Sequence, residues 1–262
     1  MHPYLNTAIK AARSAGNIIV RSMDRLDRIE ISTKTGPNDF VTSVDRAAEA
    51  EIINIISKAY PDHGILGEES GGQAGTNINE VVWIIDPLDG TMNFVHSFPH
   101  FAVSIGVQIR GVMEHGVVYN PVSNELFTAT KGSGAQLDGR RIRVSDCQNI
   151  DTALICTGFS PRYGKEPHEV VMQRLHSVLT RCADIRRTGS AALDLAYVAA
   201  GRLDAFWETC LAPWDMAAGS LLVREAGGFV SDLEGTDKFL DSGKIVAATT
   251  KVYPELINLL TV

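Results

Sequence analysis

The sequence has few cysteines and no excess of positive charge. Its four cysteines, Cys147, Cys156, Cys182 and Cys210, are nine or more positions apart, so no CxxC metal or redox pair is present. The 262 residues carry 31 acidic and 24 basic side chains, a net charge of −7. This balance argues against a surface built mainly to hold nucleic acid or an anionic membrane. A phosphorylated substrate would therefore need a local source of positive charge, such as a bound metal ion.

Long apolar runs are also missing. No segment approaches the roughly 18 apolar residues of a membrane span, and residues 1–26 lack the apolar core of a secretory signal. The same stretch is basic and rich in alanine, but Asp24, Asp27 and Glu30 argue against a transit peptide. Free thiols are typical of a reducing compartment, so we expect a cytoplasmic protein.

Several catalytic motifs are absent. The chain has no P-loop, HExxH or GxSxG sequence, and Gly132-Ser133-Gly134 lacks the third glycine of a dinucleotide-binding loop. His96 and His100 are four residues apart, but Pro99 between them disfavours a helical metal-binding pair. The ordinary 45% hydrophobic content indicates a globular chain with a large core.

Apolar periodicity predicts helices first and strands next. Residues 3–27 and 43–59 repeat apolar side chains at helical spacing, and Pro61 ends the second helix. The strands predicted up to residue 137 cover residues 64–66, 81–86, 101–109, 116–119 and 125–130, the last three forming an antiparallel meander.

After residue 137 strands and helices alternate, which is typical of an α/β arrangement. The predicted strands are 153–157, 183–187, 204–208, 229–231 and 245–248, and the predicted helices are 167–181, 190–200, 214–226 and 251–260. No linker or internal repeat separates the two patterns. We therefore predict one compact unit, residues 1–262, with sub-domains 1–137 and 138–262 and a cleft between them.

The most informative stretch is Val81 to Thr91, where an apolar strand meets the sequence Asp86-Pro87-Leu88-Asp89-Gly90. Pro87 has no amide hydrogen, so we expect the strand to stop there and the chain to turn. Two carboxylates about 4 Å apart repel by roughly 4 kcal/mol at an effective dielectric near 20. A cation would relieve this repulsion, and clustered hard oxygen ligands suit Mg²⁺. The alternative is that both acids simply form the turn.

Further acids occur at two other places. Gly67-Glu68-Glu69-Ser70 follows the short strand 64–66, and Asp215 begins the helix 214–226. Taken singly, the first is equally typical of a solvated loop, and the second of an acid at a helix N-terminus. Their joint occurrence with the Asp86 turn favours a shared site.

These residues form a pattern that resembles the inositol monophosphatase family of Mg²⁺-dependent, lithium-sensitive phosphatases, and its bacterial SuhB-type members in particular. The matching segments are WIIDPLDGTMNF (83–94), PWDMAAGSLLVREAGG (213–228) and GEES (67–70). The resemblance spans nearly the whole chain. It implies an α+β protein with the layered αβαβα sugar-phosphatase fold, an antiparallel meander in its N-terminal part and an α/β C-terminal part.

The resemblance also implies a set of metal ligands. Glu68, Asp86 and the Leu88 carbonyl would hold one Mg²⁺, and Asp86, Asp89 and Asp215 a second. A third, weaker ion would rest on Glu68 and water. The expected cofactor is therefore two to three Mg²⁺ ions.

The resemblance also implies catalytic roles for individual residues. Thr91 would orient the attacking water, Asp45 would accept the Thr91 hydroxyl hydrogen, and Glu68 would help to deprotonate the water. Lys34 resembles a family lysine near the metals, although an exposed loop lysine is the simpler interpretation. Amides of Gly90 and Thr91 would bind the phosphate.

For the sugar end, Gly189-Ser190-Ala191 matches a loop that contacts inositol hydroxyls, and Glu208 matches an acid that accepts their hydrogens. Asp89 and Asp215 would also border the substrate. One residue departs from the family pattern: Met92 stands where the family has threonine. We therefore expect the packing or the hydrogen bonding of this side chain to differ from that in the family.

The resemblance therefore leads us to expect hydrolysis of myo-inositol monophosphate to inositol and phosphate. Members of the family are typically dimeric, so we also expect a homodimer. The alternatives are other phosphomonoesters, namely fructose bisphosphate, histidinol phosphate or a nucleotide 3′-phosphate; Asn93-Phe94 favours inositol among them. A third hypothesis, implied by the SuhB resemblance, is a partner in transcription antitermination that contacts protein rather than nucleic acid.

Overall fold

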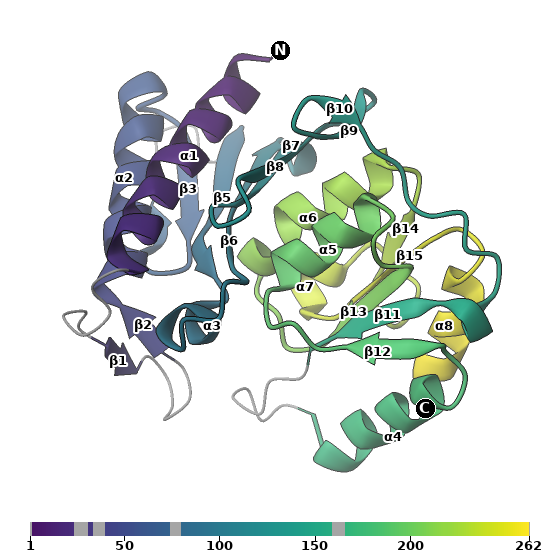
Figure 1. Cartoon of the computed structure of the whole chain (residues 1–262). Coiled ribbons are helices and arrows are strands. Elements are labelled where there is room, and N and C mark those ends of the chain that lie inside the picture. Colours follow the sequence, from purple (N-terminus) through teal and green to yellow (C-terminus); the bar gives the residue numbers. More distant parts are fainter. Residues whose placement is uncertain (1, 24–30, 34–39, 74–79, 159–165, 262) are drawn as a thin grey trace.

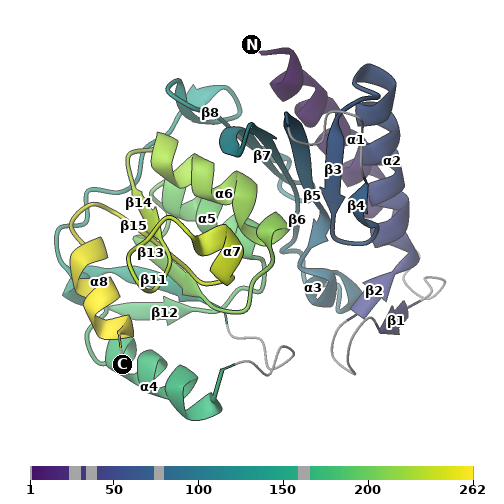
Figure 2. The ribbon, with the colours of Figure 1, turned by 180° about the vertical axis from the view of Figure 1, so that it is seen from behind.

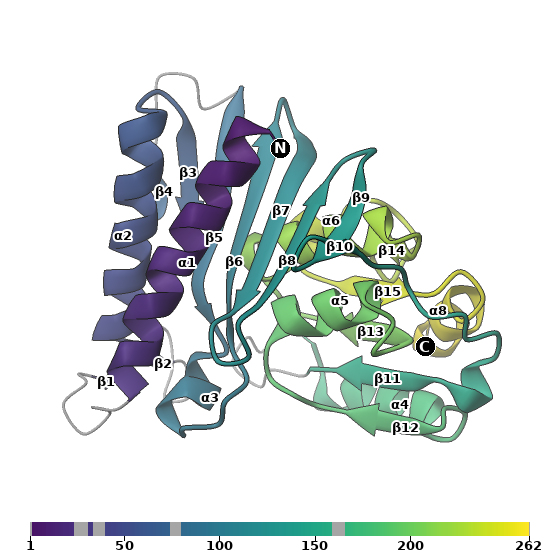
Figure 3. The ribbon, with the colours of Figure 1, turned by 45° about the horizontal axis from the view of Figure 1, so that its top comes forward.

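The structure, a computed structural model, describes residues 2–23, 31–33, 40–73, 80–158 and 166–261. In this part of the chain two large sheets alternate with three helical layers (Figures 1 and 3). The order helix, sheet, helix, sheet, helix confirms the predicted α+β fold with αβαβα layering. Among the described helices, none has the length and apolar character needed to cross a membrane.

The first layer consists of α1 (Pro3–Met23) and α2 (Ser43–Ala59), which pack against each other and against the larger sheet (Figure 3). One face of α1 carries small and aliphatic residues that are completely buried, which explains its helical apolar period. Thr42 caps α2 in a capping box with Asp45, so two otherwise unpaired donors are satisfied.

The larger sheet has eight strands in the order β10-β9-β8-β7-β6-β5-β3-β4. Their bounds are β3 Gly64–Gly67, β4 Gly71–Gln73, β5 Val81–Asp89, β6 Ala102–Ile109, β7 Val112–Asn120, β8 Glu125–Thr130, β9 Gly134–Leu137 and β10 Arg140–Arg141. Strands β5 to β10 form an antiparallel meander, whereas β3 pairs with β5 in parallel. The meander prediction is confirmed and the sheet is wider than the sequence indicated.

Strand β5 corrects the prediction that the strand ends at Asp86. It continues to Asp89, because its pairing with β6 is interrupted after Asp86 and resumes where Asp89 faces Ala102. Pro87 cannot donate to the ladder, and the irregular register absorbs this loss without ending the strand. The two acids therefore flank a bulge in a strand, and the tight turn comes after Asp89.

The middle layer contains α5 (Ala191–Ala199) and α6 (Pro213–Glu225), which lie between the two sheets (Figures 1 and 2). Residues 216–223 of α6 are all buried, as expected for a helix covered on every side. The Ser104 hydroxyl of β6 donates to the Trp214 carbonyl at 3.2 Å. This contact helps to fix the start of α6 against the sheet, close to β5.

The second sheet has five strands in the order β12-β11-β13-β15-β14. Their bounds are β11 Leu154–Thr157, β12 Asp184–Arg186, β13 Ala205–Glu208, β14 Phe229–Ser231 and β15 Ile245–Ala248. Strand β11 pairs in parallel with β12 and β13, whereas the β13–β15 and β14–β15 pairs are antiparallel. Helices α4 (His168–Leu179) and α8 (Tyr253–Leu260) cover its outer side (Figure 2).

Short elements complete the described part of the chain. They are β1 Ile31–Thr33, β2 Phe40–Thr42, α3 Thr91–Val95, the 3₁₀ turn Ile150–Thr152 and α7 Phe239–Ser242. One apolar cluster combines residues such as Phe127 of the first sheet with Phe206 of the second and Leu222 of α6. The division into sub-domains at residues 137 and 138 stays a prediction, and this shared core joins the two parts.

Candidate metal centre

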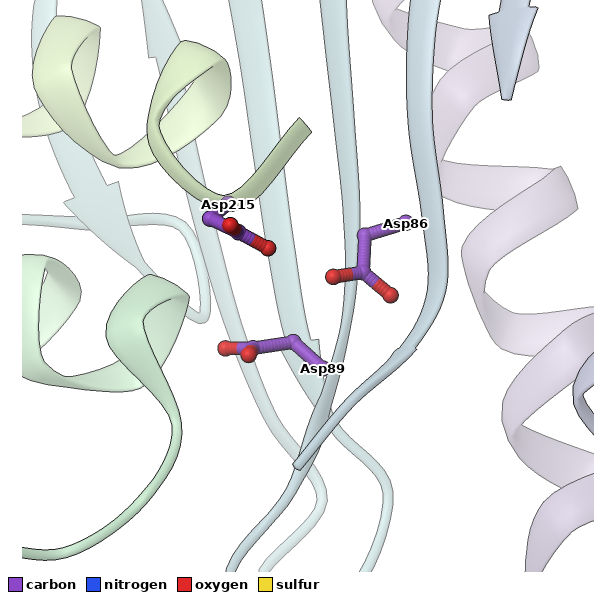
Figure 4. Close-up of side chains that lie close together, drawn as sticks. All are labelled: Asp86, Asp89 and Asp215. Carbon is purple, nitrogen blue, oxygen red and sulfur yellow. The ribbon is translucent and has the colours of Figure 1, made fainter. Parts of the chain in front are cut away.

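Three aspartates converge where β5 meets the start of α6 (Figure 4). Asp86 and Asp89 come from β5, and Asp215 from the first turn of α6. One carboxylate oxygen from each residue lies within 4.8 Å of the others. Asp86 is 1% and Asp89 9% exposed. Asp86 and Asp215, which are 129 positions apart in the chain, thus share one carboxylate cluster, in which Asp86 and Asp89 are buried and Asp215 is half-buried.

Each carboxylate is held by donors from the nearby backbone. Asp86 Oδ1 accepts the Leu88 amide at 2.9 Å, and Asp215 Oδ2 accepts the Ala212 amide at 2.7 Å. Asp89 Oδ2 accepts from the Ser190 hydroxyl and the Ala192 amide. These bonds orient the carboxylates, and each group still has the capacity to accept more at its other oxygen.

Burial and mutual repulsion raise the pKa values of all three acids. For Asp86 the causes are burial first, then the charges of Glu68, Asp89 and Asp215. Burial raises the pKa of Asp89 to about 6, although its bonds to Ser190 and Ala192 oppose the shift. Burial, Asp89 and Glu68 raise the pKa of Asp215. A divalent cation would reverse this balance, because it favours the ionised carboxylates.

Glu68 lies at the edge of the same cluster. It follows β3, and its amide donates to the Ile85 carbonyl of β5 at 3.1 Å. Its side chain is hydrogen-bonded to Asp86. Leu88 is completely buried, and its carbonyl oxygen lies 3.1 Å from the hydroxyl oxygen of Thr91. All five residues predicted as metal ligands therefore belong to one neighbourhood; their role as ligands stays a prediction.

Thr91 and Asp45 are hydrogen-bonded to each other, as the family resemblance implies. The Thr91 hydroxyl donates to Asp45 Oδ1 at 2.9 Å. Asp45 Oδ2 accepts from the Thr42 amide at 2.9 Å and from its hydroxyl at 2.5 Å. Asp45 is completely buried. The N-terminal turn of α2 thus orients a hydroxyl beside the acid cluster.

Gly90 makes the sharp turn between β5 and α3. Its φ of 99° lies in the left-handed region, and a Cβ there would come within 3.1 Å of the His100 carbonyl and 3.2 Å of the Gly189 carbonyl. A larger residue would be strained for both reasons. The turn therefore allows the segment of Gly189 to approach the end of β5.

Asn93 connects these two segments, a role that the motif alone did not indicate. Its Nδ2 donates to the His100 carbonyl at 2.7 Å and to the Thr188 carbonyl at 2.8 Å. One amide of α3 therefore holds both loops. Met92, where the family pattern differs, is half-buried.

Two of the predicted sugar-binding residues, Ser190 and Glu208, lie near the acid cluster. Ser190 caps α5, which begins at the buried Ala191, and the Ser190 side chain is 1% exposed with its hydroxyl 2.6 Å from Asp89. Glu208 ends β13, and its pKa is raised by burial and by the charges of Asp194, Asp215 and Asp89. The Ser190 hydroxyl is thus engaged with an acid of the cluster.

Two buried acids near the site, Asp194 and Glu49, were not predicted from the sequence. Asp194 accepts the Thr188 hydroxyl at 2.5 Å, and burial raises its pKa to about 7. Glu49 accepts two backbone amides of the Glu68 segment. Both acids interrupt the buried face of a helix, a signal that is readable in sequence. Lys34 lies outside the described residues.

The described residues thus combine a layered fold with a carboxylate cluster that could hold a metal ion. The model of the inositol monophosphatase family matches residues 1–261. Nus factor SuhB of Escherichia coli K12 is 54% identical over 257 residues, which cover 98% of this chain and 95% of that protein.

Solved structures agree with this assignment. The extragenic suppressor protein SuhB of Bartonella henselae is 44% identical with a TM-score of 0.95 and 99% of each chain covered. An inositol monophosphatase from Anabaena is 37% identical with a TM-score of 0.86, covering 98% of this chain and 94% of that one. The chain belongs to the inositol monophosphatase family, which confirms the resemblance.

Proposed function

We propose that this protein is a Mg²⁺-dependent phosphomonoesterase that hydrolyses myo-inositol monophosphate to inositol and phosphate. The observation that carries the proposal is the buried cluster of Asp86, Asp89 and Asp215 beside the Thr91–Asp45 hydrogen bond. A phosphate ester brings negative charge, which an unneutralised acid cluster would repel. The cluster and the substrate are compatible when cations lie between them.

The donor set fits magnesium. It consists of carboxylate and carbonyl oxygens, the hard ligands that Mg²⁺ prefers. Asp86, Asp89 and Asp215 would hold one ion, and Glu68, Asp86 and the Leu88 carbonyl another, with a weaker third site at Glu68. When bound, Mg²⁺ would lower the pKa of water and stabilise the charge on the transferred phosphoryl group.

The chain's own residues supply orientation and a proton acceptor. A threonine hydroxyl has one hydrogen, and Thr91 donates it toward Asp45. The lone pairs of Thr91 are then available to accept a hydrogen from the attacking water. Glu68, hydrogen-bonded within the cluster to Asp86, would help to take up the one proton that this water loses when it attacks the phosphorus.

The substrate would lie between α3 and the second sheet. Amides of Gly90 and Thr91 would contact the phosphate, and Glu208 would accept the hydrogens of sugar hydroxyls, for which a carboxylate is well suited. At Gly189-Ser190-Ala191 the backbone is the proposed contact, because the Ser190 hydroxyl is bonded to Asp89.

A substrate panel tests this proposal. Phosphate release from myo-inositol 1-phosphate should depend on Mg²⁺, and its kcat/KM should exceed the values for fructose 1,6-bisphosphate, histidinol phosphate and adenosine 3′,5′-bisphosphate. We expect Li⁺ at tens of millimolar to inhibit. A higher kcat/KM for another ester would identify that ester, and not myo-inositol 1-phosphate, as the substrate. If no ester released phosphate in the presence of Mg²⁺, the proposed phosphatase activity would be refuted.

A second candidate function is a role as a protein partner in transcription. It is favoured by the relatives named Nus factor SuhB at 54% identity. Such a role does not need the acid cluster. Asp86→Asn should then still co-purify with RNA polymerase, whereas equal failure of wild type and variant to do so would argue against it. A homodimer is also proposed, and sedimentation equilibrium would measure it.

A further inference from the structure

Glu49 is a buried acid that faces the segment carrying Glu68. It lies one helical turn after Asp45 on α2 and is 3% exposed. Its Oε2 accepts the Glu69 amide at 2.9 Å, and its Oε1 accepts the Ser70 amide at 2.8 Å. Burying a carboxylate costs several kcal/mol unless donors compensate it. Each oxygen of Glu49 therefore accepts one backbone amide, and these two hydrogen bonds offset the cost of burying the carboxylate.

These bonds fix the backbone around Glu68 on both sides. The Glu68 amide itself donates to the Ile85 carbonyl of β5, and the next two amides donate to Glu49. Three consecutive amides, 68 to 70, are thus anchored to two different elements. Since the Glu68 backbone cannot easily shift, its side chain is directed toward Asp86, to which it is hydrogen-bonded.

The residue before Glu68 leaves room for this arrangement. A Cβ built on Gly67 would lie 2.6 Å from Glu49 Oε2, closer than real Cβ atoms approach an oxygen. Glycine at this position lets the carboxylate come against the main chain. The close contact with Gly67, the two hydrogen bonds from backbone amides and the burial of Glu49 are separate observations, and all three indicate that Glu49 holds the backbone of this segment in place.

We propose that Glu49 is a positioning residue that sets Glu68 for Mg²⁺ binding; this inference rests on the proposed function of Glu68 as a metal ligand. Glu49 itself would not touch the ion. Carboxylate bonds to backbone amides are among the stronger hydrogen bonds in proteins. Partners of this kind typically change metal affinity about 10- to 100-fold when they are mutated.

The test is Glu49→Gln, which keeps the shape but points an NH₂ group at one of the two amides. Hydrogen exchange of the Glu69 and Ser70 amides in metal-free protein should accelerate. The Mg²⁺ concentration for half-maximal stabilisation in thermal unfolding should rise about 10-fold or more. Glu51→Gln is the matched control: Glu51 is on the same helix, and its Oε1 accepts only the Ser14 hydroxyl among the contacts described. It should leave both readouts as in wild type.

Glu49→Asp provides a second variant if the first does not fold. It keeps the charge but is one methylene shorter, so it cannot reach both amides, and the same two changes are expected to a smaller degree. Unchanged Mg²⁺ half-saturation in the folded variants would overturn the inference, even if they were less stable. Absence of Mg²⁺ binding by wild type would instead refute the proposed function, and with it this role of Glu49.

Discussion

The molecule contains two groups of acids that differ in the hydrogen bonds their carboxylates accept. Asp45 and Glu49, both on α2, have donors at both oxygens of each carboxylate. For Asp86, Asp89 and Asp215, the backbone and serine donors described above reach one oxygen of each carboxylate, and oxygens of the three residues lie within 4.8 Å of one another. Asp45, Glu49, Asp86 and Asp89 are all buried, so burial alone does not distinguish the two groups.

The difference separates acids whose carboxylates bond to the protein itself from acids that we propose to bind a cation. An acid whose oxygens all accept hydrogen bonds stabilises the fold, whereas acids that face one another destabilise it until a cation binds. Removing charge should therefore have opposite effects on stability in the two groups. The predictions below test this contrast.

The largest effect is expected for Asp86→Asn. With metal and substrate, kcat/KM should fall about 10³-fold or more, because metal-based charge stabilisation is worth several kcal/mol. In EDTA, however, the variant should be more stable than wild type by about 1 kcal/mol, since repulsion at a buried site is removed. Phosphate release and urea unfolding measure the two quantities.

Asp45→Asn is the matched comparison. It places an NH₂ group against the donors of Thr42 and should lower the free energy of unfolding by about 1–3 kcal/mol. If both variants shifted stability in the same direction, the proposed division of the acids would be wrong.

The next effect concerns pH. In the folded, metal-free chain the pKa of Asp89 is about 6 and that of Asp194 about 7, against the ordinary aspartate value of 3.8. The folded chain therefore binds more protons than the unfolded chain between these values, so the contribution of these acids to stability is present at low pH and is lost as pH rises toward 7. For Asp89 the loss is on the order of 3 kcal/mol.

This pH dependence is measured by unfolding in EDTA between about pH 4 and 7.5. Asp194→Asn should make the decline less steep, and saturating Mg²⁺ should oppose it, because the cation favours ionised carboxylates. A free energy of unfolding that rises across this window in EDTA would contradict the assignment.

Thr91→Val should lower kcat about 10²-fold, since a misplaced attacking water costs about that much. The substitution preserves shape, so Mg²⁺ half-saturation should stay as in wild type, and Thr91→Ser should retain most activity. Steady-state kinetics at saturating Mg²⁺ measure this. If Thr91→Val shifted metal affinity instead of kcat, the hydroxyl would belong to the metal-binding group.

The smallest effect is expected for Glu208→Gln. One acceptor for substrate hydroxyls becomes a donor, and KM should rise about 10-fold, which corresponds to about 1.4 kcal/mol. Inhibition by inorganic phosphate, which has no sugar, should be unchanged. An equal loss of phosphate affinity would show that Glu208 acts on the anionic end of the site.

Local sequence signals predicted much of the fold. The helix over residues 43–59 and the strands over 125–130, 229–231 and 245–248 have the bounds that the periodicity indicated. Strand β5 was predicted too short, because the local rule for proline does not include pairing with β6, which resumes beyond Pro87. Short strands such as β4 (Gly71–Gln73) carry too few apolar residues to produce a periodic signal.

The acids of the candidate site were predicted because they occur in recognisable motifs, and their convergence depended on the family resemblance. Glu49 and Asn93 were assigned no such roles, since their partners are backbone groups 20 and 95 residues away. No local pattern encodes such contacts. An acid such as Glu49 between the buried Ala48 and Ile52 is nevertheless a signal that sequence reading can use.

The hydrogen bonds from α5 to Asp89 link the acid cluster to the packing of the middle layer. Asp89 belongs to the larger sheet, yet its orientation depends on Ser190 and Ala192, which lie at the start of α5 between the two sheets. A small displacement of one sheet relative to the other would rotate this carboxylate. The affinity of the proposed ion site should therefore depend on whether the two halves are correctly docked, and a folding intermediate with only one half formed should bind the ion weakly.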